Sequence, residues 1–343
     1  MRKLMSIREI KSLSPIPKAD VIETAQVDGW EVVVKKGLHQ VGDKVVYLEI
    51  DSFLPISEEV FADFCARSTK KAINPDGDKV EGHVLKTIKL RGQISQGAII
   101  PLKDFKELDS NSTQEDVDQW MAKHGVFKYE PPAMRENPSI VASFPTQYAQ
   151  RTDSQRVQNL DDDFLASLNP GKWYATEKVD GTSATFFKDE EGKLRAASRN
   201  WEVSLDDDSK GNVYSIIANQ CHLDDILSPG EVIQGEIVGE SIQGNRLKLS
   251  GLHLYVFSTS GIKPGSAAED FVKSHHVPKV ELSFPHTVEE AVKQVNGLKS
   301  LITPGVNAEG VVWWNNEGEV FEELDNRANF KAINNKFLLK YTD

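Results

Sequence analysis

The residues of this chain best suited to chemistry lie in the stretch 172–187, KWYATEKVDGTSATFF. A lysine, Lys178, stands between a β-rich run and the turn Val179-Asp180-Gly181, with carboxylates at Glu177 and Asp180 on either side. A lysine amine is a nucleophile only when it is neutral, and its ordinary pKa is about 10.4. Taken alone, Lys-x-Asp-Gly also fits a hairpin turn with a solvated lysine, because Asp-Gly is a favoured turn pair. Residues elsewhere in the chain must decide between these interpretations.

Further charged and aromatic residues follow the lysine in a definite order. Arg199 lies in SRNWE, Glu236 in GEIVGE, Phe257 in YVFS, Glu309 in AEGVVW and Lys331 in FKAI. This series resembles the motifs of the covalent nucleotidyltransferases, the superfamily of polynucleotide ligases and RNA capping enzymes. Together with TDSQRVQNL upstream of the lysine, SRNWE and GEIVGESIQGN are more similar to RNA ligases than to DNA ligases.

The resemblance implies a covalent mechanism. Lys178 would attack the α-phosphorus of ATP, expel pyrophosphate and carry AMP, which splits one difficult displacement into easier steps. AMP would pass to an RNA 5′-phosphate, and a 3′-OH would then displace AMP and seal the ends. The implied nucleotide contacts are Lys331 on the α-phosphate, Arg199 on the ribose or a phosphate, Phe257 on the adenine face, Glu177 at the adenine edge and Arg156 at the β- or γ-phosphate. The competing interpretations are a core position for Phe257, a helix surface for Arg156 and a terminal helix for Lys331.

Three acids, Asp180, Glu236 and Glu309, match the superfamily motifs. Carboxylates alone would favour the charged ammonium, whereas a divalent cation or the charge of Lys331 would lower the pKa of Lys178. The three therefore make sense chiefly as ligands of Mg²⁺ or Mn²⁺, directly or through water, because these ions prefer oxygen ligands and bridge phosphates. The alternative for each acid is a solvated or paired surface carboxylate.

Two positions depart from the superfamily pattern. The last motif often reads Lys-x-Lys in relatives, but here Asn329 takes the first position and only Lys331 remains. The strand after Glu309 reads GVVWWNN, where relatives often have a basic residue. Both departures leave fewer cations for the triphosphate or the RNA end.

The N-terminal third reads as short strands that are separated by turns. WEVVVKKG and DKVVYLEI, joined at Gly42-Asp43, predict a hairpin, VLKTIKLRG alternates with a period of two, and QGAIIPL closes the set. Several strands in about a hundred residues predict a small barrel, of which the OB-fold is the common nucleic-acid-binding version. A barrel with a purely structural role is the alternative. A short helix is expected over 114–124.

Basic residues on this barrel are candidates for RNA contacts. The net charge of −12 argues against non-specific coating of nucleic acid, yet 84–106 has five basic residues against one acid. The candidates for a groove that follows an RNA backbone are Lys35, Lys36, Lys86, Lys89 and Arg91. Solvated strand ends explain them nearly as well.

The rest of the chain predicts an α+β domain. YEPPAMRENPS, 129–139, is typical of a linker, so we expect an OB domain with a helical extension at 1–128, a linker at 129–140 and a nucleotidyltransferase domain at 141–343. SATFFKDEEGKLRAASRN predicts a hairpin. EVIQGEIVGE, LHLYVFS and EGVVWWN predict strands, and SAAEDFVKSHH and TVEEAVKQVNGL predict amphipathic helices. Grouped strands with helices inserted late favour α+β over a βαβ alternation.

An OB domain placed first resembles the small RNA ligase family described from an amoeboflagellate, in which it precedes the adenylyltransferase domain. The expected function is an ATP-dependent RNA ligase for 3′-OH and 5′-phosphate ends. A DNA ligase, a GTP-dependent capping enzyme and a non-catalytic RNA-binding protein with a degenerate nucleotide domain are the alternatives. With no apolar run of membrane-spanning length, no secretory signal, and only Cys65 and Cys221 as cysteines, we expect an intracellular, cytoplasmic monomer without disulfides or zinc.

Overall fold

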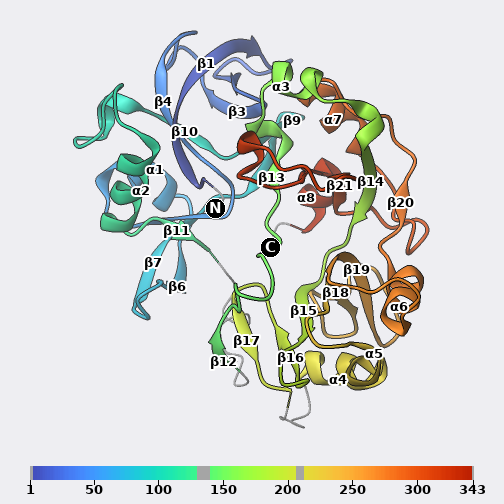
Figure 1. The fold of residues 1–343 in the computed structure, drawn as a ribbon. Coiled ribbons are helices and arrows are strands. Elements are labelled where there is room, and N and C mark those ends of the chain that lie inside the picture. The colour runs from blue at the N-terminus through green and yellow to red at the C-terminus, as the bar shows by residue number, and fades with distance from the viewer. Residues whose placement is uncertain (1–2, 130–139, 206–211, 342–343) are drawn as a thin grey trace.

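The computed structural model describes residues 3–129, 140–205 and 212–341. An N-terminal barrel lies beside a C-terminal part that is built from two sheets, with helices on the outer faces of both sheets (Figure 1). Strands are grouped rather than alternating regularly with helices, so the prediction of an α+β chain with an N-terminal OB-fold is confirmed.

The barrel consists of a five-stranded sheet, a four-stranded sheet and a separate hairpin. Alternation along its strands places Trp30, Val32 and Val34 of one strand in the interior. The strands of the first sheet, in spatial order, are β10 (Ala98–Pro101), β4 (Lys44–Leu48), β1 (Met5–Pro15), β2 (Ile22–Val27) and β3 (Trp30–Lys35). The second sheet contains β11 (Phe127–Lys128), β5 (Ser52–Pro55), β7 (Lys79–Val84) and β6 (Lys70–Ile73). The hairpin consists of β8 (Thr87–Leu90) and β9 (Gln93–Gln96).

The predicted hairpin between 30–35 and 44–48 is wrong, although both strands form. β3 pairs with β2, and β4 lies between β1 and β10. Gly42 and Asp43 exchange backbone hydrogen bonds with Ile10 of β1 instead of closing a turn. The tight turn lies at Asp28-Gly29, between Val27 and Trp30, which pair directly. The longer segment after β3 has enough length to cross to another position in the sheet.

The helix expected over 114–124 is confirmed as α2 (Gln114–Lys123). Thr113 and Asp116 form a reciprocal capping box that satisfies the first backbone donors of α2. Val117 and Trp120 then pack into the barrel core. The barrel also contains a short helix, α1 (Ala62–Cys65).

The C-terminal part contains two sheets that pack against different helices. The first, in spatial order, contains β13 (Gln155–Arg156), β22 (Asn329–Ile333), β21 (Gly310–Asn315), β14 (Trp173–Lys178) and β20 (Lys279–Val280). The second contains β12 (Ile140–Ser143), β17 (Trp201–Val203), β16 (Leu194–Ala197), β15 (Thr182–Lys188), β18 (Val232–Gly239) and β19 (Leu252–Ser260). The expected hairpin is confirmed as β15–β16.

Each sheet has its own hydrophobic core. The core of the first sheet includes α3 (Asp162–Ser167) and α7 (Val288–Val295). The core of the second includes α4 (Val213–Gln220), α5 (Leu223–Ile226) and α6 (Ala267–His275). The last helix, α8 (Asn335–Tyr341), follows β22 directly. The two amphipathic helices expected from the sequence are thus confirmed as α6 and α7.

The barrel contacts the C-terminal part through a small set of close contacts. The Trp30 indole donates to Asn159 Oδ1 at 2.8 Å, and the Gly29 amide donates to the Gln158 carbonyl at 3.2 Å. A Cβ on Gly29 would lie 2.5 Å from Val288 of α7, so only glycine allows this approach. The linker expected at 129–140 falls largely outside the described residues, and the domain boundaries stay a prediction.

Cys65 and Cys221 are both free and partly buried, and burial raises the pKa of each thiol. Neither is therefore held as a reactive thiolate. Within 3–129, 140–205 and 212–341, the helices are all too short or too polar to cross a membrane.

Candidate active site

Lys178 lies where the chain passes from one sheet to the other. β14 of the first sheet ends at Lys178, and β15 of the second sheet begins at Thr182. The buried side chain of Val179 anchors the connection in a cluster with Val238 and Val277. A Cβ on Gly181 would lie 2.2 Å from the Ile237 carbonyl oxygen, so the connection can lie against β18 only with glycine there. The Lys-x-Asp-Gly stretch is thus a junction between sheets and not a hairpin turn.

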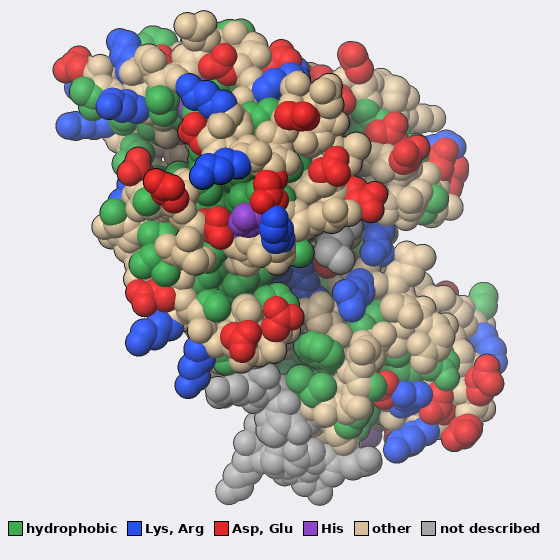
Figure 2. Space-filling view, turned by 90° about the vertical axis from the view of Figure 1, so that its left-hand side faces the viewer, with side chains coloured by type: hydrophobic (Ala, Val, Ile, Leu, Met, Phe, Trp, Pro, Cys, Tyr) green, Lys and Arg blue, Asp and Glu red, His purple; other side chains and the backbone are tan. Residues whose placement is uncertain are grey.

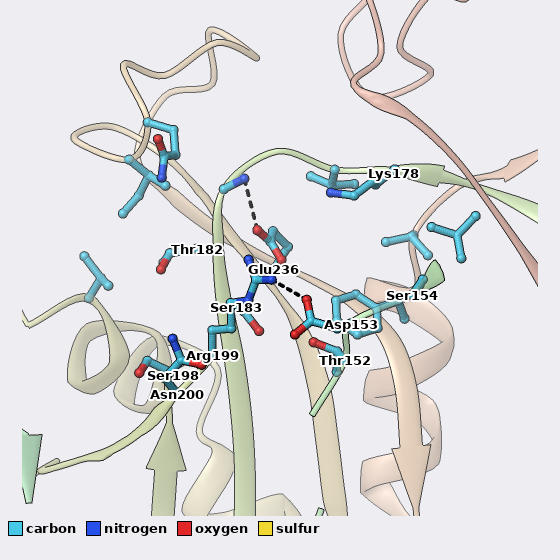
Figure 3. A pocket seen from close by; sticks show the side chains of 18 of the residues that line it. Thr152, Asp153, Ser154, Lys178, Thr182, Ser183, Ser198, Arg199, Asn200 and Glu236 are labelled. Carbon is cyan, nitrogen blue, oxygen red and sulfur yellow. Dashed lines mark hydrogen bonds and ion pairs between the residues drawn. The ribbon is translucent and has the colours of Figure 1, made fainter. Parts of the chain in front are cut away.

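A cavity of about 800 Å³ lies at this junction (Figure 3). Both sheets and the barrel contribute side chains to its wall. The predicted site residues that line it are Glu177, Lys178, Arg199, Glu236, Phe257 and Lys331. Asp180 and Glu309 are not among the lining residues, but Glu309 contacts Lys178 directly.

The amine of Lys178 forms an ion pair with the carboxylate of Glu309. Its Nζ donates to both oxygens of Glu309, at 2.7 and 2.6 Å. Burial alone would lower the pKa of Lys178, but the negative charges of Glu309, Glu236 and Asp180 outweigh it and raise the pKa above its ordinary value. In the ligand-free site Lys178 is therefore in its ammonium form.

The two other acids at the junction, Glu236 and Asp180, have raised pKa values. Burial raises the pKa of Glu236 to about 8, aided by the charges of Glu309 and Asp180 and opposed by Lys178. Glu236 accepts a hydrogen bond from the Gly181 amide at 3.1 Å. Burial and Glu309 likewise raise the pKa of Asp180 to about 6, against the opposing charges of Arg246 and Lys178. Three carboxyl groups at the junction thus lie around two cations, Lys178 and Arg246.

This arrangement fits a divalent cation. The donor set consists of carboxylate oxygens, which suit Mg²⁺ or Mn²⁺, and added positive charge would relieve the raised pKa values of Glu236 and Asp180. In the described part of the chain, no group of three or more His, Cys, Asp or Glu side chains is arranged to hold a metal ion by itself. Contacts to an ion through water are therefore the form of the metal prediction that this arrangement favours.

Arg199 forms an ion pair with Asp153 at the cavity wall (Figure 3). Burial would raise the pKa of Asp153, but Arg199, Lys331 and Lys128 outweigh it and hold the pKa below its usual value. Lys331 of β22 and Lys128 of the barrel thus act on the same carboxylate from different domains. The three cations form a positively charged wall suited to phosphate oxygens.

Another part of the wall suits a planar base. Phe257 of β19 and Trp314 of β21 lie with ring centroids 6.1 Å apart and an interplanar angle of 21°. The Trp314 indole donates to Thr176 Oγ1 at 2.9 Å, which fixes its ring. Glu177 accepts the Leu301 amide at 2.7 Å through Oε2. Burial raises the pKa of Glu177, while Ser300, Leu301 and Ile302 oppose that shift.

Arg156 lies in β13, against the barrel, and does not line the cavity. Its Nε lies 3.3 Å from Glu49 Oε1, and its guanidinium lies over the Trp30 ring at 5.6 Å from the centroid. It is paired in register with Lys331 on the neighbouring strand β22. A role at the β- or γ-phosphate stays a prediction.

The five basic residues predicted to contact RNA on the barrel do not all line one hollow. Lys35 and Lys86 line a second hollow, on the barrel, while Lys36, Lys89 and Arg91 are not among its lining residues. The face in Figure 2 mixes basic and acidic side chains without a continuous basic stripe. An RNA-binding role for these five residues stays a prediction.

Several residues of the site were missed by sequence reasoning. They are Asp153, Arg246 and Trp314 of the C-terminal part, and Asp51, Lys128 and Tyr129 of the barrel. Asp153 lies in TDSQRVQNL, a stretch that resembles RNA ligases, whereas no motif marks the barrel residues. Trp314 and Arg246 lie within or just after stretches that resemble superfamily motifs, and their position there was the available signal.

Comparisons with known proteins agree with this architecture. Residues 171–333 match a family model described as RNA ligase, and residues 4–102 match one described as an OB-fold domain. A structure of Naegleria gruberi RNA ligase with PPi is 33% identical, with a TM-score of 0.81 and coverage of 100% of this chain and 100% of that chain. A variant of that ligase with ATP and Mn is 33% identical, with a TM-score of 0.80 and 100% coverage of both chains. Another variant, with AMP and Mn, is 32% identical, with a TM-score of 0.81 and the same coverage. The search of curated proteins found no match.

Proposed function

The chain belongs to the RNA ligase family, and we propose that it uses ATP to join RNA 3′-OH and 5′-phosphate ends through a lysyl-AMP intermediate at Lys178. The observation that carries the proposal is the position of Lys178, at the junction of two sheets, in a cavity that three acids, a cationic wall and an aromatic wall surround. The ATP, AMP and Mn complexes of the similar Naegleria gruberi ligase support ATP as the donor.

In the first step Nζ of Lys178 gives up a proton and attacks the α-phosphorus of ATP. A P–N bond forms, the bond from the α-phosphorus to the bridging oxygen breaks, and pyrophosphate leaves with the electron pair. The carboxylate of Glu309, at 2.6 Å, is placed to hold the amine and to receive its proton. Lys331 and Arg199 lie on the cavity wall, where their charges suit the phosphates of the nucleotide.

Asp180, Glu236 and Glu309 would hold Mg²⁺ or Mn²⁺, directly or through water. When bound, such an ion supplies positive charge that lowers the pKa of the amine and stabilises negative charge on the α-phosphate. The ligand-free arrangement, in which Lys178 remains an ammonium, is then an inactive resting state.

In the second step a 5′-phosphate oxygen of RNA attacks the α-phosphorus and releases Lys178. In the third step a 3′-OH attacks the 5′-phosphate, and AMP leaves. The barrel residues Asp51, Lys128 and Tyr129 at the cavity wall support an approach of RNA between the barrel and the nucleotidyltransferase domain. We propose 1–128 and 141–343 as these two domains, joined by 129–140.

The test is transfer of label from α-³²P-ATP to the protein with Mg²⁺ or Mn²⁺ present, followed by sealing of nicked RNA. The parent and Lys172→Ala, a control at a partly exposed lysine in an ion pair with Glu317, should become labelled, and Lys178→Ala should not. Labelling by GTP instead of ATP would indicate a capping enzyme. Sealing of nicked DNA but not RNA would indicate a DNA ligase. A parent protein that takes no label would indicate a binding protein.

A further inference from the structure

Arg246, which none of the matched motifs includes, is bound to the carboxylate beside the nucleophile. Its Nη1 donates to both oxygens of Asp180, at 3.2 and 3.0 Å. Both side chains are largely buried, with exposed fractions of 17% and 16%, so water screens this contact little. Arg246 therefore reaches the Lys-x-Asp-Gly junction from the loop between β18 and β19, the strands that carry Glu236 and Phe257.

The loop that presents Arg246 is held in a fixed shape. Asn245 donates through Nδ2 to the Leu249 carbonyl at 2.8 Å, and its Oδ1 accepts the Leu249 amide at 2.9 Å. Leu247 is buried in the same cluster as Val179, the residue between Lys178 and Asp180. The loop and the junction thus share one small core, which fixes the distance between them.

The C-terminal helix α8 holds the guanidinium of Arg246 from the other side. The guanidinium carbon lies 5.6 Å from the Phe337 ring centroid and 5.0 Å from the Tyr341 ring centroid. These two aromatic residues are four positions apart, so they share one face of the helix, and their rings lie 4.8 Å apart. A planar guanidinium suits this aromatic contact, which a lysine ammonium would make less well.

The start of α8 is tied to the other partner of Lys178. The amide of the fully buried Asn334 donates to the Glu309 carbonyl at 2.8 Å. Its side-chain oxygen accepts the amides of Gly297 and Lys336 at 2.9 and 3.0 Å. α8 also packs against β8 of the barrel. One helix therefore touches the segment of Glu309, the side chain of Arg246 and the barrel.

We propose that Arg246 is a positioning residue for the transfer of AMP to Lys178, and that α8 keeps it in place through Phe337 and Tyr341. The proposal rests on the proposed function. Because Nη1 of Arg246 donates to both oxygens of Asp180, the arginine fixes the orientation of this carboxylate at the junction. Because Asp180 is two residues from Lys178, its displacement would move the nucleophile relative to the α-phosphorus.

The first test compares Arg246→Gln and Arg246→Lys with the parent in single-turnover labelling by α-³²P-ATP. Small displacements of reacting groups cost up to about 100-fold in rate, so we expect the rate constant of Arg246→Gln to fall roughly 10- to 100-fold. Arg246→Lys should fall less, because it keeps the charge but loses the planar stack. The labelled fraction at the end of the reaction and the ATP concentration at half-saturation should stay near the parent values. Lys248→Gln, an exposed basic residue of the same loop, is the matched control and should react like the parent.

The second test separates the role of the helix from that of the arginine. Tyr341→Phe keeps the ring over Arg246 and should react at the parent rate. Tyr341→Leu removes the ring and should slow labelling in the same direction as Arg246→Lys, again at an unchanged labelled fraction. A Tyr341→Leu protein that reacts at the parent rate would overturn the assignment of α8.

The outcomes distinguish this inference from the proposed function. If the parent takes no label, the proposed function fails and the inference falls with it. If the parent is labelled and Arg246→Gln is labelled at the same rate, only the inference is overturned. A lower labelled fraction with an unchanged rate constant would show that Arg246 serves folding alone and would overturn it as well.

Discussion

The charges around Lys178 are compatible with its proposed role as a nucleophile among acids. In the ligand-free protein the ammonium is bound by Glu309 and surrounded by Asp180 and Glu236, so its pKa is raised. A neutral amine then appears only when further positive charge enters the site. Under the proposed mechanism, we therefore expect the amine to react only when nucleotide and cation are both present.

Glu177 gives a prediction about nucleotide affinity. A carboxylate oxygen in the cavity wall can accept a hydrogen bond from the amino group of adenine, whereas the amide that Gln offers is partly a donor. Glu177→Gln keeps an acceptor for the Leu301 amide. We expect its half-saturating ATP concentration to rise roughly tenfold, equivalent to about 1.4 kcal/mol, with little change in the maximal labelling rate. A titration of labelling rate against ATP checks this, and an unchanged half-saturation would contradict it.

The same residue predicts a pH dependence of stability. Burial raises the pKa of Glu177 above its unfolded value, so over the interval between the two the folded state holds a proton that the unfolded state has lost. Stability therefore falls as pH rises through that interval. Glu177→Gln removes this loss, and we expect it to be more stable than the parent at pH 8, with the difference narrowing toward pH 4. Thermal melting of the ligand-free proteins measures it, with Glu191→Gln, an exposed turn residue, as the control. A difference that grows toward low pH would contradict the sign.

At the scale of elements, the site depends on strands that come together where the two C-terminal sheets join. β14 delivers Lys178, β18 delivers Glu236, β22 delivers Lys331 and the residue before β21 is Glu309. Strands of different sheets can bring these residues together only if the chain crosses closely between sheets. Three residues make that crossing, and the last of them is Gly181.

Gly181 therefore gives the clearest prediction at this scale. The Cβ of Gly181→Ala would lie 2.2 Å from the Ile237 carbonyl oxygen, a contact that backbone atoms cannot relieve without separating β15 from β18. We expect loss of lysine labelling. We also expect a lower melting temperature, because an overpacked contact typically lowers the free energy of unfolding by about 1–3 kcal/mol. In Gly171→Ala the new Cβ meets only the Asn169 side chain at 3.4 Å, so this control should behave like the parent. Full labelling of Gly181→Ala would contradict the close crossing.

At the scale of the molecule, the barrel and the nucleotidyltransferase part are joined by a buried ion pair. Glu49 of the barrel is 1% exposed and lies 3.3 Å from Arg156 of β13, whose side chain is 9% exposed. Arg156 is paired in register with Lys331, so the barrel acts on a strand next to a predicted nucleotide contact. The barrel thus contacts the strand that lies beside β22, which carries Lys331.

This interface predicts that Glu49→Gln is strongly destabilising. The substitution leaves the buried guanidinium of Arg156 without its charged partner, which typically costs about 3–5 kcal/mol. Urea unfolding should show a lower midpoint, and labelling with ATP should weaken. Glu9→Gln, which removes a solvent-accessible ion pair between Glu9 of β1 and Lys44 of β4, should leave the midpoint unchanged. Equal midpoints for Glu49→Gln and the parent would show that the barrel is not fixed through this pair.

Elements that depend on nearby residues were predicted correctly from the sequence, but a strand pairing that depends on distant residues was not. α2, the β15–β16 hairpin, α6 and α7 follow from capping residues, turn residues and periodicity, all of which act within about ten residues. β3 pairs with β2 and not with β4, because the chain after β3 crosses to a position between β1 and β10 before β4 begins. A turn-like Gly42-Asp43 pair carries no information about that choice, because Ile10, distant in sequence, takes its hydrogen bonds.

The sequence by itself determined which residue types are available for chemistry and their order along the chain, because each superfamily motif is a short local stretch of sequence. The family membership and the N-terminal OB-fold that this order predicted are confirmed. Only the tertiary structure decided that Glu309 binds Lys178 and that Arg246 lies between Asp180 and α8. It also decided that Arg156 lies against the barrel. The physical reason is that these contacts join loops, a terminal helix and separate domains, whose relative positions are set by packing and not by any local pattern.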